Sequence, residues 1–393
     1  MSRVKFEIGL ESFLRKEYRK YRKVRLGVLC NQASVDKKLK HISETVLAPS
    51  LNLQVTCFFG PQHGVRGEKQ DDMKESPDFE DPRSKLPVYS LYGASREPSE
   101  AALDKVDAFL IDLQDIGTRI YTFVYTMANC MHAARKLGKK VIVLDRPNPI
   151  NGTSLEGNVL EKEFSSFVGQ YPICARHGMT IGELAHLFNE EFGIHCDLEV
   201  IPLRGWKREH FWDDLGREWI PPSPNIPILL SALVFPGCVL FEGTNISEGR
   251  GTTRPFELIG APYIDPDKLA LEMNRQKLRG VYFRPVYFQP TFQKWKEEVC
   301  GGVQIHVTDR RQINAFEVGV KLLAAIVEHF RDGFAWKNPP YEYEYERMPV
   351  DLIAGTQKLR EAIDSRKGLS RFLESAREQV SQLQKVRKKY LLY

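Results

Sequence analysis

Residues 106–115 read V-D-A-F-L-I-D-L-Q-D, an apolar run that ends in acidic and amide side chains. Three further stretches of the first half have the same form: V-R-L-G-V-L-C-N (24–31), L-Q-V-T-C-F-F-G (53–60) and K-V-I-V-L-D-R-P (140–147). Near-continuous apolar strands are typical of a parallel sheet that is covered on both faces. Helical patterns around 37–48 and over 119–137 alternate with them, as in α/β proteins. We therefore expect a Rossmann-like parallel-sheet domain over residues 1–165.

The second half has a less regular pattern. Thr180 and Glu183 form a capping-box pair at the start of a helix predicted over 179–192. The remaining predicted elements are strands at 198–203, 280–288 and 302–309, and helices at 312–331 and 367–390. We expect a smaller α+β domain over residues 166–393, and the site in the cleft between the two domains. The alternating patch Y-E-Y-E-Y-E (341–346) receives no role.

Length and composition exclude several classes of protein. At about 150 residues per domain, a chain of 393 residues indicates two domains. A hydrophobic content of 42% and a charged content of 27% are those of a globular protein, which excludes wholesale disorder. The net charge of +5 is small for this length and is not a nucleic-acid-binding signature.

The cysteines and the N-terminus point to a reducing compartment. The seven cysteines are odd in number, and no two of them have C-x-x-C spacing. We therefore expect buried free thiols and no disulfide framework. Charges interrupt the first 23 residues throughout, and no run of 18 apolar residues occurs. These features predict neither a signal peptide nor a membrane span, and hence a cytoplasmic protein.

The common cofactor and hydrolase motifs are missing. The first strand leads into N-Q-A-S-V-D without G-x-G-x-x-G, which disfavours a nicotinamide or flavin cofactor and a nucleotide-binding role. Neither the P-loop motif nor G-x-S-x-G nor H-E-x-x-H occurs. Because the histidines are also dispersed, we expect no cofactor and no metal site.

Polar side chains follow all four predicted strands of the first half. They are Asn31, then Gln62 and His63, then the stretch from Asp112 to Arg119, and finally Asp145, Arg146 and Asn148. Ligands bind beyond the carboxyl ends of the strands in open α/β sheets. Asp and Asn also make turns at strand ends, but clusters after four consecutive strands favour a binding or catalytic face.

Two glycine-containing stretches carry further polar groups. The loop P-Q-H-G-V-R-G-E (61–68) is either a substrate-contacting loop or a solvated turn. The stretch E-G-T-N-I-S-E-G-R-G-T-T-R-P-F-E-L-I-G-A-P (242–262) combines four glycines with acids, arginines and hydroxyl groups. We expect it to connect an apolar strand, V-L-F, with a helix-like segment, P-F-E-L-I. Its glycines allow the backbone to approach a polar ligand closely, which favours binding.

Several motifs together resemble one family, the NamZ-type exo-β-N-acetylmuramidases. The matching segments are F-G-P-Q-H-G-V-R-G (59–67), V-Y-S-L-Y-G (88–93), D-L-Q-D-I-G-T-R-I-Y-T-F (112–123), L-D-R-P-N-P (144–149), S-F-V-G-Q-Y-P-I (166–173), R-H-G-M-T-I-G-E-L-A (176–185), P-S-P-N-I-P (222–227), the stretch 242–262 and P-T-F (290–292). The resemblance implies a Rossmann-like domain, a smaller C-terminal domain and a cleft between them. The implied reaction releases β-linked N-acetylmuramic acid (MurNAc) from the non-reducing end of peptidoglycan fragments, in cell wall recycling.

The sequence departs from the family pattern at one position. The family motif in the loop after the second strand is P-E-H-G, and the resemblance implies that its glutamate is the catalytic acid/base. Here the residue is Gln62, whose amide cannot transfer a proton. We therefore expect either a weakened or inactive member, or another carboxylate in that role. The candidate catalytic residues are Gln62, Glu68, Asp115 and Glu248.

The implied substrate predicts cationic and polar binding groups. A lactyl carboxylate, as in MurNAc-GlcNAc or a muropeptide, suits the planar fork of arginine. The candidate substrate-binding residues are His63, Arg66, Asp112, Gln114, Arg119, Tyr121, Asp145, Arg146, Asn148, His177, Asn225, Glu242, Asn245, Ser247, Arg250, Thr252 and Arg254. Retaining, inverting and substrate-assisted hydrolysis all stay open. A non-catalytic sugar-binding protein with the same cleft is the alternative function.

Overall fold

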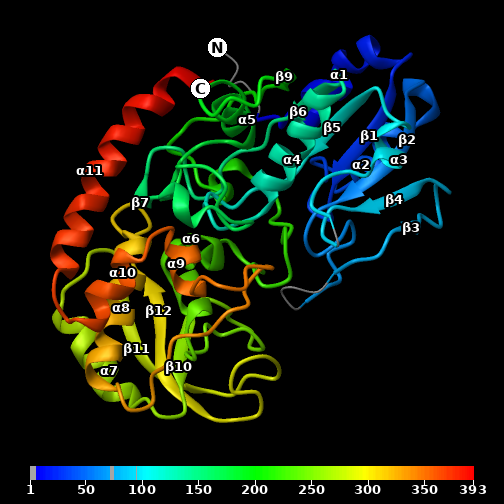
Figure 1. Cartoon of the computed structure of the whole chain (residues 1–393). Coiled ribbons are helices and arrows are strands. Elements are labelled where there is room, and N and C mark those ends of the chain that lie inside the picture. Colours follow the sequence, from blue (N-terminus) through cyan, green and yellow to red (C-terminus); the bar gives the residue numbers. More distant parts are fainter. Residues whose placement is uncertain (1–5, 71–74, 94) are drawn as a thin grey trace.

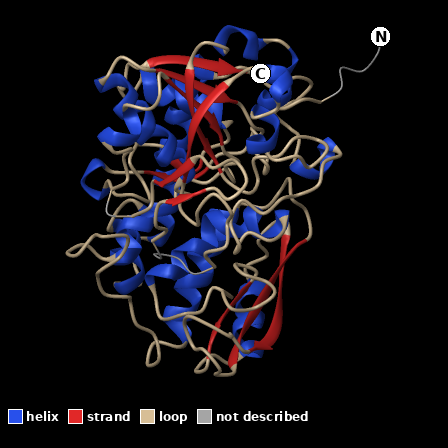
Figure 2. Ribbon diagram, turned by 90° about the vertical axis from the view of Figure 1, so that its right-hand side faces the viewer, coloured by secondary structure: helices blue, strands red, loops and turns tan. Residues whose placement is uncertain are grey.

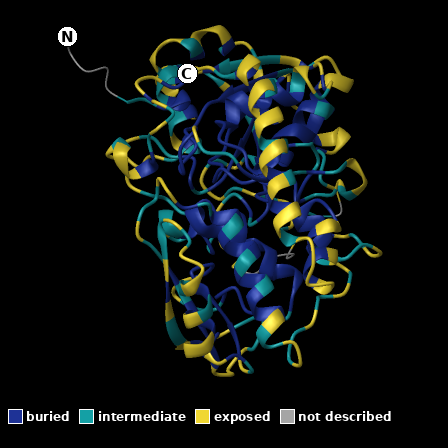
Figure 3. Cartoon of the chain, turned by 90° about the vertical axis from the view of Figure 1, so that its left-hand side faces the viewer, coloured by how far each residue is buried: buried dark blue, intermediate teal, exposed yellow. Residues whose placement is uncertain are grey.

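The computed structural model describes residues 6–70, 75–93 and 95–393. Figure 1 shows an α/β half, which contains the N-terminal strands, above a second half with its own small sheet. The last helix, α11 (Leu369–Arg387), runs along both halves and returns the C-terminus to the α/β half. Its outward face is exposed, whereas the helices and strands behind it are buried (Figure 3).

The α/β half is built on a seven-stranded sheet. Its strand order is β3 (Phe79–Glu80), β4 (Pro87–Ser90), β2 (Gln54–Gly60), β1 (Arg25–Cys30), β5 (Ala108–Asp112), β6 (Lys140–Leu144) and β9 (Asp197–Ile201). All neighbouring strands are parallel except β3 and β4, which are antiparallel. The predicted parallel sheet and its four apolar strands are therefore confirmed. Because β9 belongs to this sheet, the sheet continues past residue 165, and the expected domain boundary remains a prediction.

Both faces of the sheet are covered, which is why its strands are apolar throughout. Phe109 and Ile111 of β5 pack in the main hydrophobic core, which also contains residues of α3 (Glu100–Leu103), α4 (Phe123–Lys136) and α5 (Ile181–Glu190). Ala108 and Leu110 point to the opposite face, where the second core contains residues of α1 (Gly9–Arg15) and α2 (Ile42–Val46). The predicted capping box is present at α5, where Thr180 accepts from the backbone of Glu183.

The second half contains a three-stranded antiparallel sheet and a helical layer (Figure 2). The sheet order is β10 (Leu258–Ala261), β12 (Cys300–Val307) and β11 (Val281–Phe288). Its helices are α6 (Leu229–Cys238), α7 (Pro266–Arg275), α8 (Ala315–His329), α9 (Pro349–Ala354) and α10 (Lys358–Asp364). A hairpin of β7 (Glu156–Val159) and β8 (Cys174–Arg176) packs against α11. Within the described residues, no helix combines the length and apolarity that a membrane crossing requires.

Two local predictions around the glycine-rich stretch are wrong. The V-L-F segment lies in a 3-10 helix, Val239–Gly243, that continues from α6, instead of forming a strand. A short apolar run does not distinguish a buried helix from a buried strand, and α6 is apolar on nearly all sides. The P-F-E-L-I segment runs into strand β10 instead of a helix, because residues 258–261 pair with residues 301–304 of β12. The backbones approach closely at Gly301 and Gly302.

Candidate active site

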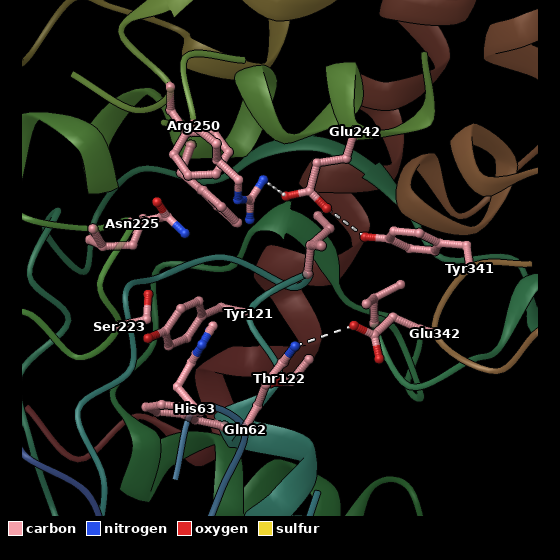
Figure 4. Close-up of a pocket in the computed structure, with 16 residues that line it drawn as sticks. Gln62, His63, Tyr121, Thr122, Ser223, Asn225, Glu242, Arg250, Tyr341 and Glu342 are labelled. Carbon is pink, nitrogen blue, oxygen red and sulfur yellow. Dashed lines mark hydrogen bonds and ion pairs between the residues drawn. The ribbon is translucent and has the colours of Figure 1, made fainter. Parts of the chain in front are cut away.

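A pocket lies where the ends of the α/β strands meet the second half (Figure 4). About 520 Å³ of empty space lies between its walls, part of it open to solvent. The α/β half and the following loop supply Gln62, His63, Ile120, Tyr121, Thr122, Phe123, Val168, Ser223, Asn225 and Ile226. The second half supplies Phe235, Glu242, Arg250, Phe256, Tyr341 and Glu342. The pocket therefore needs both halves of the chain.

Gln62 lies in the pocket directly after β2, with both ends of its amide engaged. Its Oε1 accepts a hydrogen bond from the Thr122 hydroxyl at 2.7 Å. Its Nε2 donates to Oε1 of Glu342 at 3.2 Å (Figure 4). Because a hydroxyl approaches one end and a carboxylate the other, the amide orientation is fixed. The carboxylate belongs to a segment 280 residues further along the chain.

Glu342 is buried and surrounded by donors, with only 7% of its surface exposed. The Tyr92 hydroxyl lies 3.0 and 2.9 Å from its two oxygens. A guanidinium nitrogen of Arg96 lies 3.4 Å from Oε2. Burial and the nearby charge of Glu342 raise the pKa of Tyr92 above its ordinary value, so Tyr92 keeps its proton and donates it. The carboxylate form of Glu342 is thus the form that its neighbours stabilise.

A second carboxylate, Glu242, also lines the pocket. Its Oε1 accepts from Arg250 at 2.6 Å, and its Oε2 accepts from the Tyr341 hydroxyl at 2.7 Å (Figure 4). Arg250 also donates to Glu248 at 3.1 Å. Glu248 in turn lies 2.5 Å from the ammonium of Lys294. Glu242 and Arg250 line the pocket, and Arg250 connects Glu242 to Glu248, which lies behind the wall with Lys294.

His63, Tyr121 and Asn225 complete the predicted residues that line the pocket. The Nδ1 of His63 donates to the Lys69 carbonyl at 2.7 Å, which fixes the ring. Burial raises the pKa of Tyr121 above its ordinary value, so its phenol stays protonated. Asn225 donates to the Gln70 carbonyl at 2.8 Å. Six predicted residues are thereby brought together: Gln62, His63, Tyr121, Asn225, Glu242 and Arg250.

Other predicted residues of the strand ends are buried in contacts behind the pocket. Arg146 bonds both oxygens of Asp112, at 2.6 and 2.9 Å. Asp115 is paired with His177 at 3.1 Å. The Asp112–Arg146 ion pair joins the ends of the neighbouring strands β5 and β6, and the Asp115–His177 contact joins the loop after β5 to the segment after β8. None of the four side chains lines the pocket. The expected approach of Glu248 to Asp115 is replaced by these separate pairings.

Further predicted residues bond backbone atoms of adjoining loops. Arg119 is fully buried and donates to four carbonyls, those of Asn158, Ile173, Ile353 and Ala354. Gln114 and Asn148 donate to the carbonyls of Pro147 and Met179. Asp145 accepts from the hydroxyls of Thr180 and Tyr393 at the base of α5. These groups fix the loops that carry the pocket residues, and they do not line the pocket themselves.

The remaining predicted residues lie in the two glycine-containing stretches, outside the pocket lining. Asn245 donates to the Gly333 carbonyl, and Thr252 donates to that of Gly249. The Ser247 hydroxyl accepts from the Gly249 amide, and Arg254 pairs with Glu257. Arg66 lies over the Phe79 ring at 4.8 Å. Glu68, like these five residues, is not part of the pocket wall.

Sequence reasoning missed several pocket residues, above all Glu342. Its segment, Y-E-Y-E-Y-E, has no strand-end position or motif that marks it, and it lies far from Gln62 in the sequence. Thr122 and Ser223 lie in segments that match the family, but their residue types suggested no chemistry. Tyr92 and Arg96, which hold Glu342, were also not predicted. Across the described ranges, no group of three His, Cys, Asp or Glu side chains is arranged to hold a metal ion.

Comparisons with known proteins agree over the whole chain. The family models described as exo-β-N-acetylmuramidase NamZ, N-terminal and C-terminal, match residues 26–229 and 233–393. The peptidoglycan β-N-acetylmuramidase NamZ of Bacillus subtilis (strain 168) is 42% identical over 390 residues, which cover 99% of this chain and 92% of that protein. Crystal structures of two DUF1343 family proteins of Bacteroides fragilis NCTC 9343 are also similar. One is 33% identical with a TM-score of 0.89 over all of both chains, and the other is 28% identical with a TM-score of 0.77 over 99% of each.

Proposed function

The chain belongs to the NamZ family of exo-β-N-acetylmuramidases, and from this premise we propose that it is a glycoside hydrolase of peptidoglycan fragments. Its reaction would release β-linked MurNAc from the non-reducing end, which would supply sugar for cell wall recycling. The observation that carries the proposal is the pocket between the two halves, into which two carboxylates project, Glu242 and Glu342. Glycoside hydrolysis commonly uses a pair of carboxylates at the scissile bond.

The rest of the pocket wall suits a muramic acid residue. Phe235, Phe256 and Tyr121 supply apolar surface for the carbon face of a sugar ring. Of the five arginines proposed for the lactyl carboxylate, Arg250 lines the pocket. Its charge is shared with Glu242 and Glu248, so a third carboxylate would bind at the edge of an existing network. We propose Arg250 as the group that distinguishes MurNAc from N-acetylglucosamine (GlcNAc).

A non-catalytic sugar-binding role is the second candidate, and Gln62 is the observation that favours it. An amide at this position can donate a hydrogen bond but cannot deliver a proton to a leaving group. The other side chains that line the pocket could bind a sugar whether residue 62 is glutamine or glutamate. A protein with this wall would hold the sugar and cleave it slowly or not at all.

The test is incubation of the purified protein with the MurNAc-GlcNAc disaccharide, with GlcNAc-MurNAc of reversed order as the control. Release of MurNAc from the first disaccharide alone, followed by mass spectrometry, is the expected result. An aryl β-MurNAc glycoside serves as a substrate whose leaving group needs no proton. Calorimetric binding of MurNAc without cleavage of either the disaccharide or the aryl glycoside would reject the hydrolase and establish the binding protein.

A further inference from the structure

Glu342 is the pocket carboxylate that contacts Gln62, and hydrogen-bond donors surround it. The Tyr92 hydroxyl reaches both of its oxygens, and the Gln62 amide reaches one. Arg96 also contacts Glu342, and its guanidinium lies over three aromatic rings at 3.9–4.5 Å, those of Tyr92, Phe167 and Tyr343. These contacts fix the cation beside the carboxylate. A rigidly held, donor-rich carboxylate that lines a pocket can accept a proton there.

The backbone around this carboxylate is strained. Glu342 and Tyr343 both have left-handed conformations, with φ of 48° and 67°. His63, next to Gln62 in sequence, has φ of 69°. A left-handed conformation costs about 1–2 kcal/mol for a residue with a side chain, and such residues cluster at functional sites. Left-handed residues therefore lie on both sides of the Gln62–Glu342 contact.

We propose that Glu342 is a catalytic residue of this chain, the general base that takes a proton from the attacking water. The proposal rests on the proposed muramidase function. The water oxygen forms the new bond to the anomeric carbon, while the proton passes to Glu342. The bond between the anomeric carbon and the leaving oxygen breaks, and its electron pair stays on that oxygen. Solvent protonates an alkoxide leaving group, because Gln62 holds no acidic proton.

Because the pocket supplies a base and Gln62 supplies no proton, the rate should depend on the leaving group. A phenolate leaves without a proton, so an aryl β-MurNAc glycoside needs only the base. The MurNAc-GlcNAc disaccharide has an alcohol leaving group, which Gln62 cannot protonate. We expect the aryl glycoside to be cleaved much faster than the disaccharide.

The deciding experiment compares Glu342→Gln with the wild type on the aryl glycoside, over a range of pH. The wild-type kcat/KM should rise with pH on one acid limb, as the base loses its proton. The kcat of the variant should be lower by about 10²–10⁴-fold, the usual contribution of general base catalysis. Its pH profile should also lack the acid limb. Glu346→Gln is the matched control, because Glu346 is exposed on the same segment. Its rate and pH profile should equal those of the wild type.

Tyr92→Phe tests the same base without removing it. The change deletes a donor to the carboxylate, which disfavours the ionised form, so the acid limb should move to higher pH. This variant keeps the test valid if Glu342→Gln does not fold. Wild-type turnover that neither variant alters would overturn the role of Glu342 and leave the proposed function standing. Absence of wild-type turnover on every MurNAc substrate would overturn both.

Discussion

Residue 62 determines which protons the pocket can move. The amide of Gln62 donates to Glu342 and accepts from Thr122, so it occupies the place of a protonated carboxyl group. A glutamate there would lie about 3 Å from a second carboxylate, since Gln62 Nε2 is 3.2 Å from Glu342. Two carboxylates this close share one proton, which raises the pKa of the pair's second ionisation. One substitution should therefore create an acid that holds a proton near neutral pH.

Gln62→Glu is the corresponding prediction. We expect the rate on MurNAc-GlcNAc to rise by about 10²–10⁴-fold, with a much smaller gain on the aryl glycoside, whose leaving group needs no acid. The pH profile should become bell-shaped, with a new alkaline limb. Steady-state kinetics on both substrates measure this. Equal gains on the two substrates would show that residue 62 does not protonate the leaving group.

Burial of Asp145 makes the stability of the protein depend on pH. It is fully buried, and burial raises its pKa from 3.8 to about 7, against the opposing effect of hydrogen bonds from Tyr393, Gly182 and Thr180. The folded state then binds a proton that the unfolded state has already lost. Its contribution to stability is complete below about pH 4 and is lost as the pH rises towards 7.

Asp145→Asn should remove this pH dependence. The wild type should lose stability relative to the variant between about pH 4 and pH 7. The loss is on the order of a few kcal/mol at about 1.36 kcal/mol per pKa unit. The difference in melting temperature between the two proteins, followed by calorimetry at several pH values, is the measurement. A constant difference over this range would show that Asp145 is ionised in the folded protein at pH 5.

At the scale of elements, the second half depends on the close crossing of α6 and α8. Gly237 and Gly319 face each other there, and a Cβ on either one would overlap backbone atoms of the other helix. Because α6 continues into the 3-10 helix that carries Glu242, this crossing also positions one pocket carboxylate. The helices themselves follow from their apolar residues, but the distance between them follows from the missing side chains.

Gly319→Ala should therefore destabilise the protein by about 1–3 kcal/mol or more, the usual cost of overpacking. It should also lower kcat/KM by displacing Glu242. Gly138→Ala is the control, because a Cβ there meets nothing within 4 Å. Gly138 has a left-handed backbone, so an alanine there would cost about 1–2 kcal/mol in stability from conformation alone. Circular dichroism measures both losses of stability, but only Gly319→Ala should lower kcat/KM, and an equal loss of kcat/KM in the two variants would contradict the role of the crossing.

At the scale of the whole molecule, the pocket joins segments that are far apart in the sequence. Residues after β2, at the start of α4, after α6 and before α9 all line it. Helix α11 and the C-terminal tyrosine connect the halves a second time, since Tyr393 bonds Asp145 and the amide of Leu203. A ligand in the pocket should consequently stabilise the molecule as one unit.

MurNAc should raise the melting temperature of the wild type more than GlcNAc does. A ligand at 100 times its Kd stabilises the folded state by about 2.7 kcal/mol, and the lactyl carboxylate adds the contact with Arg250. Differential scanning fluorimetry and calorimetric titration with both sugars measure the preference. If the two sugars stabilise the protein equally, or if neither does, Arg250 does not recognise the lactyl carboxylate.

The sequence by itself determined the α/β architecture, because strands buried on two faces must be apolar and are followed by polar ends. It also identified the family and Gln62, since long local motifs carry that information. Asp112 ends strand β5, and Asp115 and Arg119 follow it, as the sequence predicted. Whether such a side chain points into a pocket or into a buried ion pair is a property of packing, which local sequence does not specify.

Only the tertiary structure decided which polar residues meet. Glu342 lies 280 residues from Gln62, in a segment that no periodicity marks, and it reaches the pocket because the second half folds back over the ends of the strands. The same folding directs Arg119 to four carbonyls and leaves Arg250 at the pocket wall. A contact over such a separation depends on the three-dimensional path of the chain. Residue types and spacings constrain that path only locally, so they revealed the fold and the family but not the position of Glu342 in the pocket.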